Sequence, residues 1–167
     1  MYEVQGVKIQ EDAWRQTHLG RLLGHAMRKF DGRVRSLMAQ DDETPLALSN
    51  LAMRDKVGAA HIHLTRHLSL PGDRITDLAQ RAGMSKQAMM DVVDQCEAWG
   101  LVVRLVDPDD RRAKRVQYTD AGRQWQAAFQ RAVAQAEAEF TEAVGMDIAT
   151  VVRLGLEAYG SDVGDEA

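Results

Sequence analysis

Apolar residues recur at intervals of three and four positions over residues 12–40 and again over residues 120–144. Because an α-helix turns once in 3.6 residues, this spacing gathers them on one face of a helix. The opposite face of the first helix is basic and includes Arg28 and Arg35. The pattern predicts a long amphipathic helix near each end of the chain. Gly145 ends the second of these, and another short helix follows it.

Three further helical stretches are predicted between them, over residues 46–68 with a break near 54–55, over 75–82 and over 85–99. Pro71-Gly72-Asp73 is a strong turn signal before the last two. Gly83 suits the left-handed end of one helix, and the Ser85 hydroxyl suits the N-cap of the next. These two short helices therefore follow each other almost without a linker.

A β-hairpin is predicted directly after these helices. Residues 101–106 and 116–119 are rich in β-branched side chains, and the segment DPDDRRAKR lies between them. That segment contains a proline and many charges, as expected of an exposed hairpin loop. Two close helices followed by a hairpin with a basic tip are typical of a winged helix-turn-helix.

The predicted fold class is therefore mainly α with a small β-hairpin wing (α+β). Both long terminal helices cannot bury their apolar stripes on so small a core, so we expect them to interlock with a second copy in a homodimer. On this basis the chain divides into an N-terminal dimerisation helix and linker (1–45), a winged helix-turn-helix lobe (46–119), and C-terminal dimerisation helices with an acidic tail (120–167). Thr119 is a suitable N-cap for the last of these parts.

Composition excludes several other classes of protein. The chain has 167 residues, of which 45% are hydrophobic and 28% charged, and this is too apolar for a disordered protein. No uncharged apolar run approaches the roughly 20 residues of a membrane-spanning helix, and no secretory signal is visible. A single cysteine, Cys96, cannot form an internal disulfide. We therefore expect a reducing, cytoplasmic location and no membrane partner.

The net charge of −4 is unevenly distributed along the chain. Residues 1–119 carry a net charge of +2, and residues 120–167 carry −6. The acidic character therefore belongs to the last third of the chain. The earlier part remains able to present a positive face to a polyanion such as DNA.

Three segments resemble the MarR family of transcriptional regulators: ITDLAQRAGMSKQA from residue 75, VDQCEAWGLV from residue 93 and DPDDRRAKRVQYTDAG from residue 107. The last segment, in the predicted wing, is the most specific. The resemblance implies a homodimeric bacterial or archaeal regulator, more often a repressor than an activator, that binds a pseudo-palindromic operator. It also implies release of the operator when a small molecule binds or when a thiol is oxidised.

The outward face of the helix over 85–99 supplies the first candidate DNA contacts: Ser85, Lys86, Gln87, Met90 and Asp91. In the first turn of a recognition helix, a lysine donates to guanine and a glutamine pairs with adenine. The serine hydroxyl and the free helix amides suit a phosphate. Met90 and Asp91 depart from the small polar or basic residues of the family, and an aspartate weakens binding unless it accepts from a cytosine amino group.

The predicted wing tip supplies the remaining candidate contacts: Asp110, Arg111, Arg112 and Lys114. A guanidinium on a protruding loop suits the narrow minor groove of A·T-rich DNA. The resemblance assigns this role to an arginine of the Asp-Arg-Arg triplet. We favour Arg112, with Asp110 orienting an arginine, and the alternative interpretation is a solvated run of charges.

An effector pocket is expected between the dimerisation helices and the winged-helix lobe, as the resemblance implies. Its candidate residues are Trp14, His18, His25 and His63. The histidine pairs at helical spacing are also compatible with zinc, but no cysteine cluster or carboxylate completes either pair, so we predict no metal and no resident cofactor. Cys96 falls on the inward face of its helix, where a thiol is usually an inert small apolar group and not a redox sensor.

Motifs of enzymes are not visible: the sequence has no phosphate-binding glycine loop and no nucleophile elbow. The sequence therefore predicts no enzyme but a sequence-specific DNA-binding transcription regulator, a ligand-responsive repressor that binds its operator as a homodimer. The alternative is a winged-helix dimer that acts as a protein-interaction module without binding DNA. Met90, Asp91 and the net acidity favour that alternative.

Overall fold

The structure, a computed structural model, describes residues 14–52 and 57–161. Its elements, in chain order, are α2 (Leu19–Ala39), α3 (Leu46–Ala52), α4 (Ala59–His67), β1 (Asp73–Arg74), α5 (Ile75–Arg81), α6 (Lys86–Ala98), β2 (Val102–Val106), β3 (Lys114–Tyr118), α7 (Asp120–Val144) and α8 (Met146–Gly160). The strands form one antiparallel sheet in the order β1-β3-β2. The predicted fold class, mainly helical with a small wing, is confirmed.

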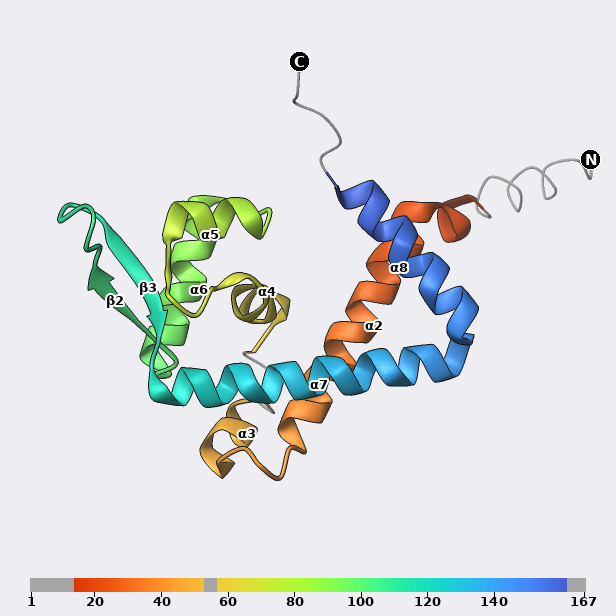
Figure 1. Ribbon diagram of the computed structural model, residues 1–167, viewed down its shortest axis with the longest axis horizontal. Coiled ribbons are helices and arrows are strands. Elements are labelled where there is room, and N and C mark those ends of the chain that lie inside the picture. Colours follow the sequence, from red (N-terminus) through yellow and green to blue (C-terminus); the bar gives the residue numbers. More distant parts are fainter. Residues whose placement is uncertain (1–13, 53–56, 162–167) are drawn as a thin grey trace, which may run out of the picture.

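Helix α7 joins the two halves of the molecule (Figure 1). One end of α7 supports a lobe of α4, α5, α6 and the sheet, and the other end leads into α8. Helix α2 packs across the middle of α7, so that its first half lies on the same side as α8. The lobe has the arrangement of a winged helix-turn-helix: α5 and α6 are the helix pair, and the β2–β3 hairpin is the wing.

The core of the lobe forms on the inward face of α6. Met89 and Val93 are fully buried there, in one apolar cluster with Ile62 of α4, Leu78 of α5 and Val116 of β3. The four inward side chains of α6, which are Met89, Val92, Val93 and Cys96, are all buried, and the residues predicted on the opposite face are exposed except for the half-buried Met90. The spacing of apolar residues therefore predicted correctly which side of α6 faces the protein and which side is exposed.

Gly122, in the first turn of α7, lies against Leu101, the residue directly before β2. A Cβ atom at this position would lie 1.8 Å from the carbonyl oxygen of Leu101, which is a backbone atom that cannot rotate away. The Thr119 hydroxyl accepts a hydrogen bond from the Gly122 amide and caps α7, as the sequence predicts. The absence of a side chain at Gly122 therefore allows α7 to begin directly beside the sheet.

Thr65 of α4 connects three elements inside the lobe. Its hydroxyl accepts a hydrogen bond from the indole N–H of Trp125 in α7, at 3.0 Å. Its carbonyl accepts from the hydroxyl of Tyr118 in β3, at 3.2 Å. All three residues are buried, so these bonds satisfy polar groups that water does not reach. Burial raises the pKa of Tyr118, which remains protonated at neutral pH.

Two boundaries differ from the sequence prediction, and one short strand was not predicted. The helix predicted over 12–40 is interrupted at His18, whose extended backbone and Nδ1 atom cap the start of α2 by accepting from the Arg21 amide. This bond satisfies a backbone donor that a new helix start leaves free. Strand β3 begins at Lys114, which pairs with Val106. Strand β1 has two residues, too few to show an alternating pattern.

Two parts of the predicted helices lie outside the described residues. These are the start of the first helix, before residue 14, and the predicted break near 54–55. In the described part of the second stretch, α3 ends at Ala52 and α4 begins at Ala59. The 46–68 stretch is thus two helices on either side of that gap.

Candidate nucleic-acid interface

The first turn of α6 is exposed and carries polar side chains. Ser85 is its N-cap, and the Ser85 hydroxyl accepts from the Ala88 amide at 3.1 Å. Lys86 and Gln87 follow directly and are both exposed, while Met90 is half-buried. The end of α6 that carries these residues lies on the same side of the lobe as the wing tip (Figure 1). The two groups of predicted contacts therefore face one surface.

Gln87 and Asp91 are joined across one turn of α6. The Gln87 Nε2 atom donates to Asp91 Oδ1 at 2.9 Å, and both side chains are exposed. This bond uses one of the two amide hydrogens of the glutamine. The other hydrogen and the amide oxygen remain for a ligand of α6.

The base of the wing is held by a buried carboxylate. Asp107 is fully buried at the end of β2, and its Oδ2 atom accepts from Arg74 Nε at 2.6 Å and from Arg115 Nε at 3.3 Å. The hydrogen bond from Arg74, the Asp109 backbone amide on Oδ1 and the charge of Arg115 lower the pKa of Asp107 below its usual value. Asp107 therefore remains ionised and ties the wing to β1 and the start of α5.

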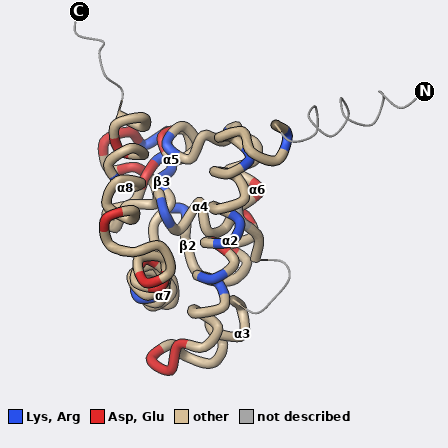
Figure 2. The backbone as a smooth tube through the Cα atoms, turned by 90° about the vertical axis from the view of Figure 1, so that its right-hand side faces the viewer, with Lys and Arg blue, Asp and Glu red and all other residues tan. Residues whose placement is uncertain are grey.

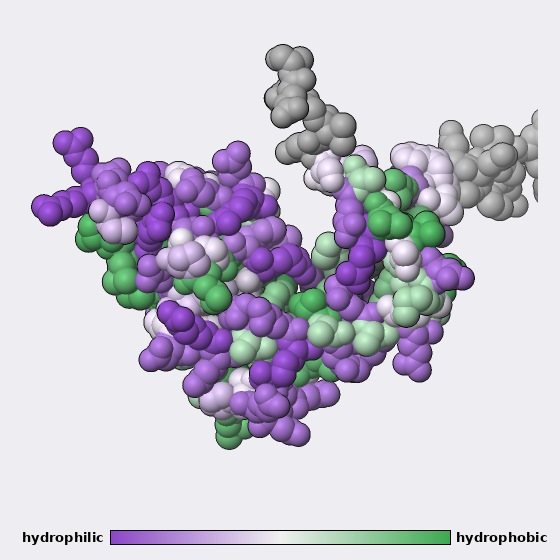
Figure 3. All heavy atoms as spheres, in the orientation of Figure 1, coloured by the Kyte–Doolittle hydropathy of each residue, from purple (hydrophilic) through white to green (hydrophobic). Residues whose placement is uncertain are grey.

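The tip of the wing exposes cations. Asp110 Oδ1 accepts from the backbone amide of Arg112 at 3.0 Å, so it shapes the turn and does not hold the Arg112 guanidinium. Arg111 and Arg112 are exposed, and no carboxylate in the described part of the chain forms an ion pair with either. Lys114 is exposed at the start of β3. Figure 3 shows hydrophilic side chains projecting from this tip.

Helix α6 and the wing are joined by a second arginine. Arg104 of β2 forms ion pairs with Asp94 and Glu97, both on the later turns of α6. Its backbone amide also donates to Glu97 Oε1, at 3.2 Å. Arg104 thus joins β2 to α6, and Asp107 joins the end of β2 to β1. These contacts hold the start of α6 and the tip of the wing at a fixed distance from each other.

Sequence reasoning missed the three residues that hold this surface together: Arg74, Arg104 and Asp107. Arg74 and Asp107 stand next to or near other charged residues, as on a solvated surface, and Arg104 is a single charge in an apolar strand. Their hydrogen-bonded ion-pair partners lie between 7 and 33 residues away along the chain. An aspartate at the exact junction of strand and loop was the one available signal, since a charge at a strand end needs a partner when it is buried.

The opposite end of the molecule exposes apolar side chains. Helix α8 has no buried residue, although most of its positions are apolar. The exposed large apolar residues of α8 are Met146, Ile148, Val151, Val152, Leu154, Leu156 and Tyr159. The first half of α2 adds Leu19, Leu22, Leu23 and Met27. We call these residues the arm surface; Figure 3 shows it on the side away from the wing.

Of the predicted effector-pocket residues, the structure brings two together. The rings of Trp14 and His18 lie with their centroids 5.5 Å apart, and both residues are exposed. His25 is exposed one to two turns further along α2. His63 lies on α4, stacked on His67 with a centroid distance of 6.1 Å, and its buried Nδ1 atom has no hydrogen-bond partner within the described structure.

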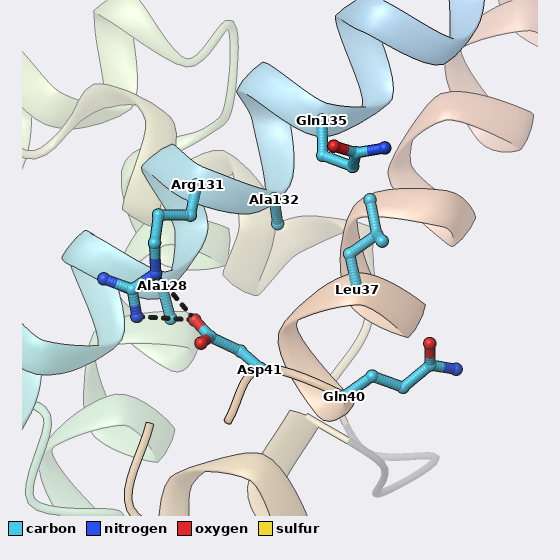
Figure 4. Close-up of a pocket in the computed structure, with 7 residues that line it drawn as sticks. All are labelled: Leu37, Gln40, Asp41, Ala128, Arg131, Ala132 and Gln135. Atoms are coloured by element: carbon cyan, nitrogen blue, oxygen red, sulfur yellow. Dashed lines mark hydrogen bonds and ion pairs between the residues drawn. The ribbon is translucent and has the colours of Figure 1, made fainter. Parts of the chain in front are cut away.

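A cavity of about 260 Å³ lies elsewhere, between the end of α2 and the middle of α7 (Figure 4). It is lined by Leu37, Gln40, Asp41, Ala128, Arg131, Ala132 and Gln135. Arg131 donates to Asp41 across its edge, as the dashed lines show. Burial acts to raise the pKa of Asp41, but the hydrogen bonds from Arg131, the Glu43 amide and Thr44 together lower it below its usual value. None of the four predicted effector residues lines this cavity.

Two other predicted side chains have clear surroundings. Cys96 is 2% exposed, and burial raises the pKa of its thiol to about 12, so it is protonated at neutral pH. Among residues 14–52 and 57–161, no three histidine, cysteine, aspartate or glutamate side chains are placed to hold a metal ion. None of the helices described combines the length and apolar character needed to cross a bilayer.

Comparison with known families identifies the winged-helix segment. The model of the MarR family matches residues 63–113, which run from α4 to the wing tip. The resemblance inferred from the sequence is thereby confirmed. No curated protein sequence matches the chain significantly.

Solved structures extend the likeness to nearly the whole chain. CouR from Rhodococcus jostii RHA1, bound to p-coumaroyl-CoA, is 22% identical with a TM-score of 0.66, over 90% of this chain and 97% of that one. CouR bound to a 23-mer DNA duplex is 24% identical with a TM-score of 0.57, over 87% and 97%. PcaV from Streptomyces coelicolor, in complex with its natural ligand, is 18% identical with a TM-score of 0.62, over 89% and 95%. At these identities the likeness establishes the fold.

Proposed function

We propose that this protein is a ligand-responsive DNA-binding transcription regulator that recognises a pseudo-palindromic operator. The observation that carries the proposal is the single surface formed by the start of α6 and the wing tip. It presents Lys86, Arg111, Arg112 and Lys114, all exposed, at a spacing fixed by buried and half-buried ion pairs. A helix start suits the major groove and an arginine-tipped wing suits the adjacent minor groove.

The arm surface supports a homodimer. An apolar stripe on α8 without any buried side chain is unfavourable in water, and a second copy of the same stripe would cover it. Six of the nine acidic residues of 120–167 lie on α7 and α8. Figure 2 shows acidic residues on both of these helices, which lie outside residues 46–119. In such a dimer two copies of α6 would enter successive major grooves, about one helical turn apart.

An effector would act on the same dimer. CouR and PcaV are similar in fold, and their structures are described with p-coumaroyl-CoA and with a natural ligand, respectively. We propose Trp14, His18, His25 and His63 as part of the effector site, because the first three lie before or on the arm half of α2 and His63 lies on α4 of the lobe. A ligand that stabilises one spacing of the two lobes over another would shift the population away from the DNA-binding form.

We also propose that the protein represses transcription and does not activate it. We propose the cytoplasm as its location and propose no enzymatic activity. The division at residues 45 and 119 is kept as the functional division between dimerisation and DNA binding.

Selection of bound DNA from genomic fragments tests this proposal. The full-length protein is incubated with fragments at about 100 mM salt, a concentration at which non-specific binding is already weakened. Enrichment of an inverted repeat with half-sites about one helical turn apart is expected. Lys86→Ala combined with Arg112→Ala should remove the enrichment. Absence of enrichment, also after unfolding, dialysis and refolding to remove a bound ligand, would favour the protein-interaction module instead.

A further inference from the structure

The hydrogen bond between Gln87 and Asp91 gives the exposed amide of Gln87 a defined orientation. Resting on the proposed function, we propose that Asp91 is a positioning residue that makes Gln87 select adenine at one position of each operator half-site. Asp91 then acts through Gln87 and does not itself read a base.

The chemistry of the two side chains determines the orientation. A carboxylate only accepts hydrogen bonds, so the 2.9 Å contact of Asp91 Oδ1 requires the nitrogen of the Gln87 amide and not its oxygen. Of the two amide hydrogens, one is then held by Asp91. One hydrogen donor and the oxygen acceptor remain, and both belong to the exposed end of the side chain.

This remaining pair matches one base edge in the major groove. Adenine presents an acceptor at N7 and a donor at N6, so one donor and one acceptor on the protein satisfy both. Guanine presents acceptors at both N7 and O6, and it would meet the amide oxygen with a second acceptor. A glutamine without Asp91 could turn over and offer both amide hydrogens to guanine, whereas the held glutamine has one to offer.

The position of the pair on α6 suits this role. Gln87 is the second residue of the helix, directly after the Ser85 N-cap and Lys86. Asp91 lies one turn further from the helix start and is itself exposed. The aspartate that departs from the family pattern is thus explained by its partner on the same helix.

Selection from a random-sequence duplex library, with the full-length protein and four variants, tests the inference. Gln87→Ala should lose the adenine preference at the position, and Asp91→Ala should reduce the preference for adenine over guanine by about ten-fold. Asp91→Asn keeps an acceptor for the Gln87 amide and should retain most of the preference. Asp42→Ala removes one exposed carboxylate outside α6 and should leave the preference unchanged. Loss of the negative charge in either alanine variant should strengthen binding to every sequence alike, so the ratio between adenine and guanine is the quantity that tests the inference.

The outcomes separate this inference from the proposed function. An enriched inverted repeat whose adenine preference is the same in wild type and Asp91→Ala would overturn the inference and leave the regulator proposal intact. Loss of a cytosine preference in Asp91→Ala would also overturn it, because the carboxylate would then read a base directly. Failure of the wild-type protein to enrich any sequence would overturn both.

Discussion

Arg66 Nη2 in α4 donates to Asp31 Oδ1 in α2 at 2.7 Å, and Asp31 is only 4% exposed. This ion pair directly links the winged-helix lobe to the helix that carries the arm surface. A second link joins Arg33 of α2 to Glu139 of α7, and here Arg33 is exposed and Glu139 is half-buried. Both ion pairs anchor α2, but the Arg66–Asp31 pair is more deeply buried than the Arg33–Glu139 pair.

Replacement of Asp31 is expected to be more harmful than replacement of Glu139. Asp31→Ala leaves Arg66 without its partner in a site where water replaces it poorly, and the free energy of unfolding should fall by about 3 kcal/mol. Glu139→Ala removes a half-buried partner of an exposed arginine, and a smaller loss of the free energy of unfolding is expected. Denaturant unfolding at pH 7 measures both. Equal losses for the two variants would show that burial of Asp31 does not set the strength of the pair.

Because Gly122 lies so close to Leu101, one added methyl group at this position should strongly lower the free energy of unfolding. In Gly122→Ala the new Cβ would overlap the Leu101 carbonyl oxygen, so α7 must shift, and we expect a loss of about 3 kcal/mol. Gly32→Ala is the matched control, because that glycine is also helical and has open space around it. It should gain about 0.5–1 kcal/mol through helix propensity. Thermal unfolding of the two variants beside wild type gives both values, and a loss in Gly32→Ala would contradict the comparison.

Local signals explain why most of the fold could be predicted from the sequence. Ser85 and Thr119 cap α6 and α7, and Gly145 ends α7 with a φ of 87°, each at the predicted position. Helix starts and ends depend on neighbouring residues alone, so they are visible in a sequence. His18 also caps α2. Because histidine is not a typical N-cap residue, the sequence did not predict that the helix is interrupted there.

The ion pairs that fix the interface could not be predicted in the same way. Arg104 finds Asp94 and Glu97, and Asp107 finds Arg74, only after β2 has folded back on α6 and β1 has joined β3. Before folding, these charges look like any other exposed charges on a helix or loop. Gln87 and Asp91 are an intermediate case, since a spacing of four on one helix face permits contact, but the spacing does not show which atoms meet.

The buried carboxylate at the base of the wing predicts a defect in DNA binding without a loss of the helical fold. In Asp107→Asn, Arg74 and Arg115 lose their common anionic partner, the wing tip loses its fixed position, and duplex affinity should fall about ten-fold, the value of one specific contact. Asp109→Asn removes the same charge from an exposed position in the same loop and should have little effect. Fluorescence anisotropy with the selected operator compares them, and equal affinities would contradict a role of Asp107 in placing the wing.

The surroundings of His61 predict a pH dependence of stability. The Gly58 amide donates to His61 Nδ1 at 3.1 Å, so Nε2 carries the ring proton and lies 2.9 Å from the accepting Oε1 of Gln95 in α6. The ring also lies on Trp99, with a centroid distance of 4.7 Å. Burial lowers the pKa of His61 below its usual value of 6.5. Protonation would also place a hydrogen on Nδ1 against the Gly58 amide, so this hydrogen bond favours the neutral ring as well.

Because the unfolded chain takes up this proton at a higher pH than the folded protein, the free energy of unfolding should be constant above pH 6.5 and should fall as the pH is lowered below it. His61→Gln cannot titrate, so it should lose part of this fall while being less stable than wild type at pH 7. The pKa of His67 is lowered as well, by burial and by nearby positive charge. His67→Gln should therefore remove a separate part of the decrease in the free energy of unfolding at low pH. Urea unfolding at pH 7.5, 6.5 and 5.5 measures the slopes. A slope in His61→Gln identical to that of wild type would show that the proton is taken up elsewhere.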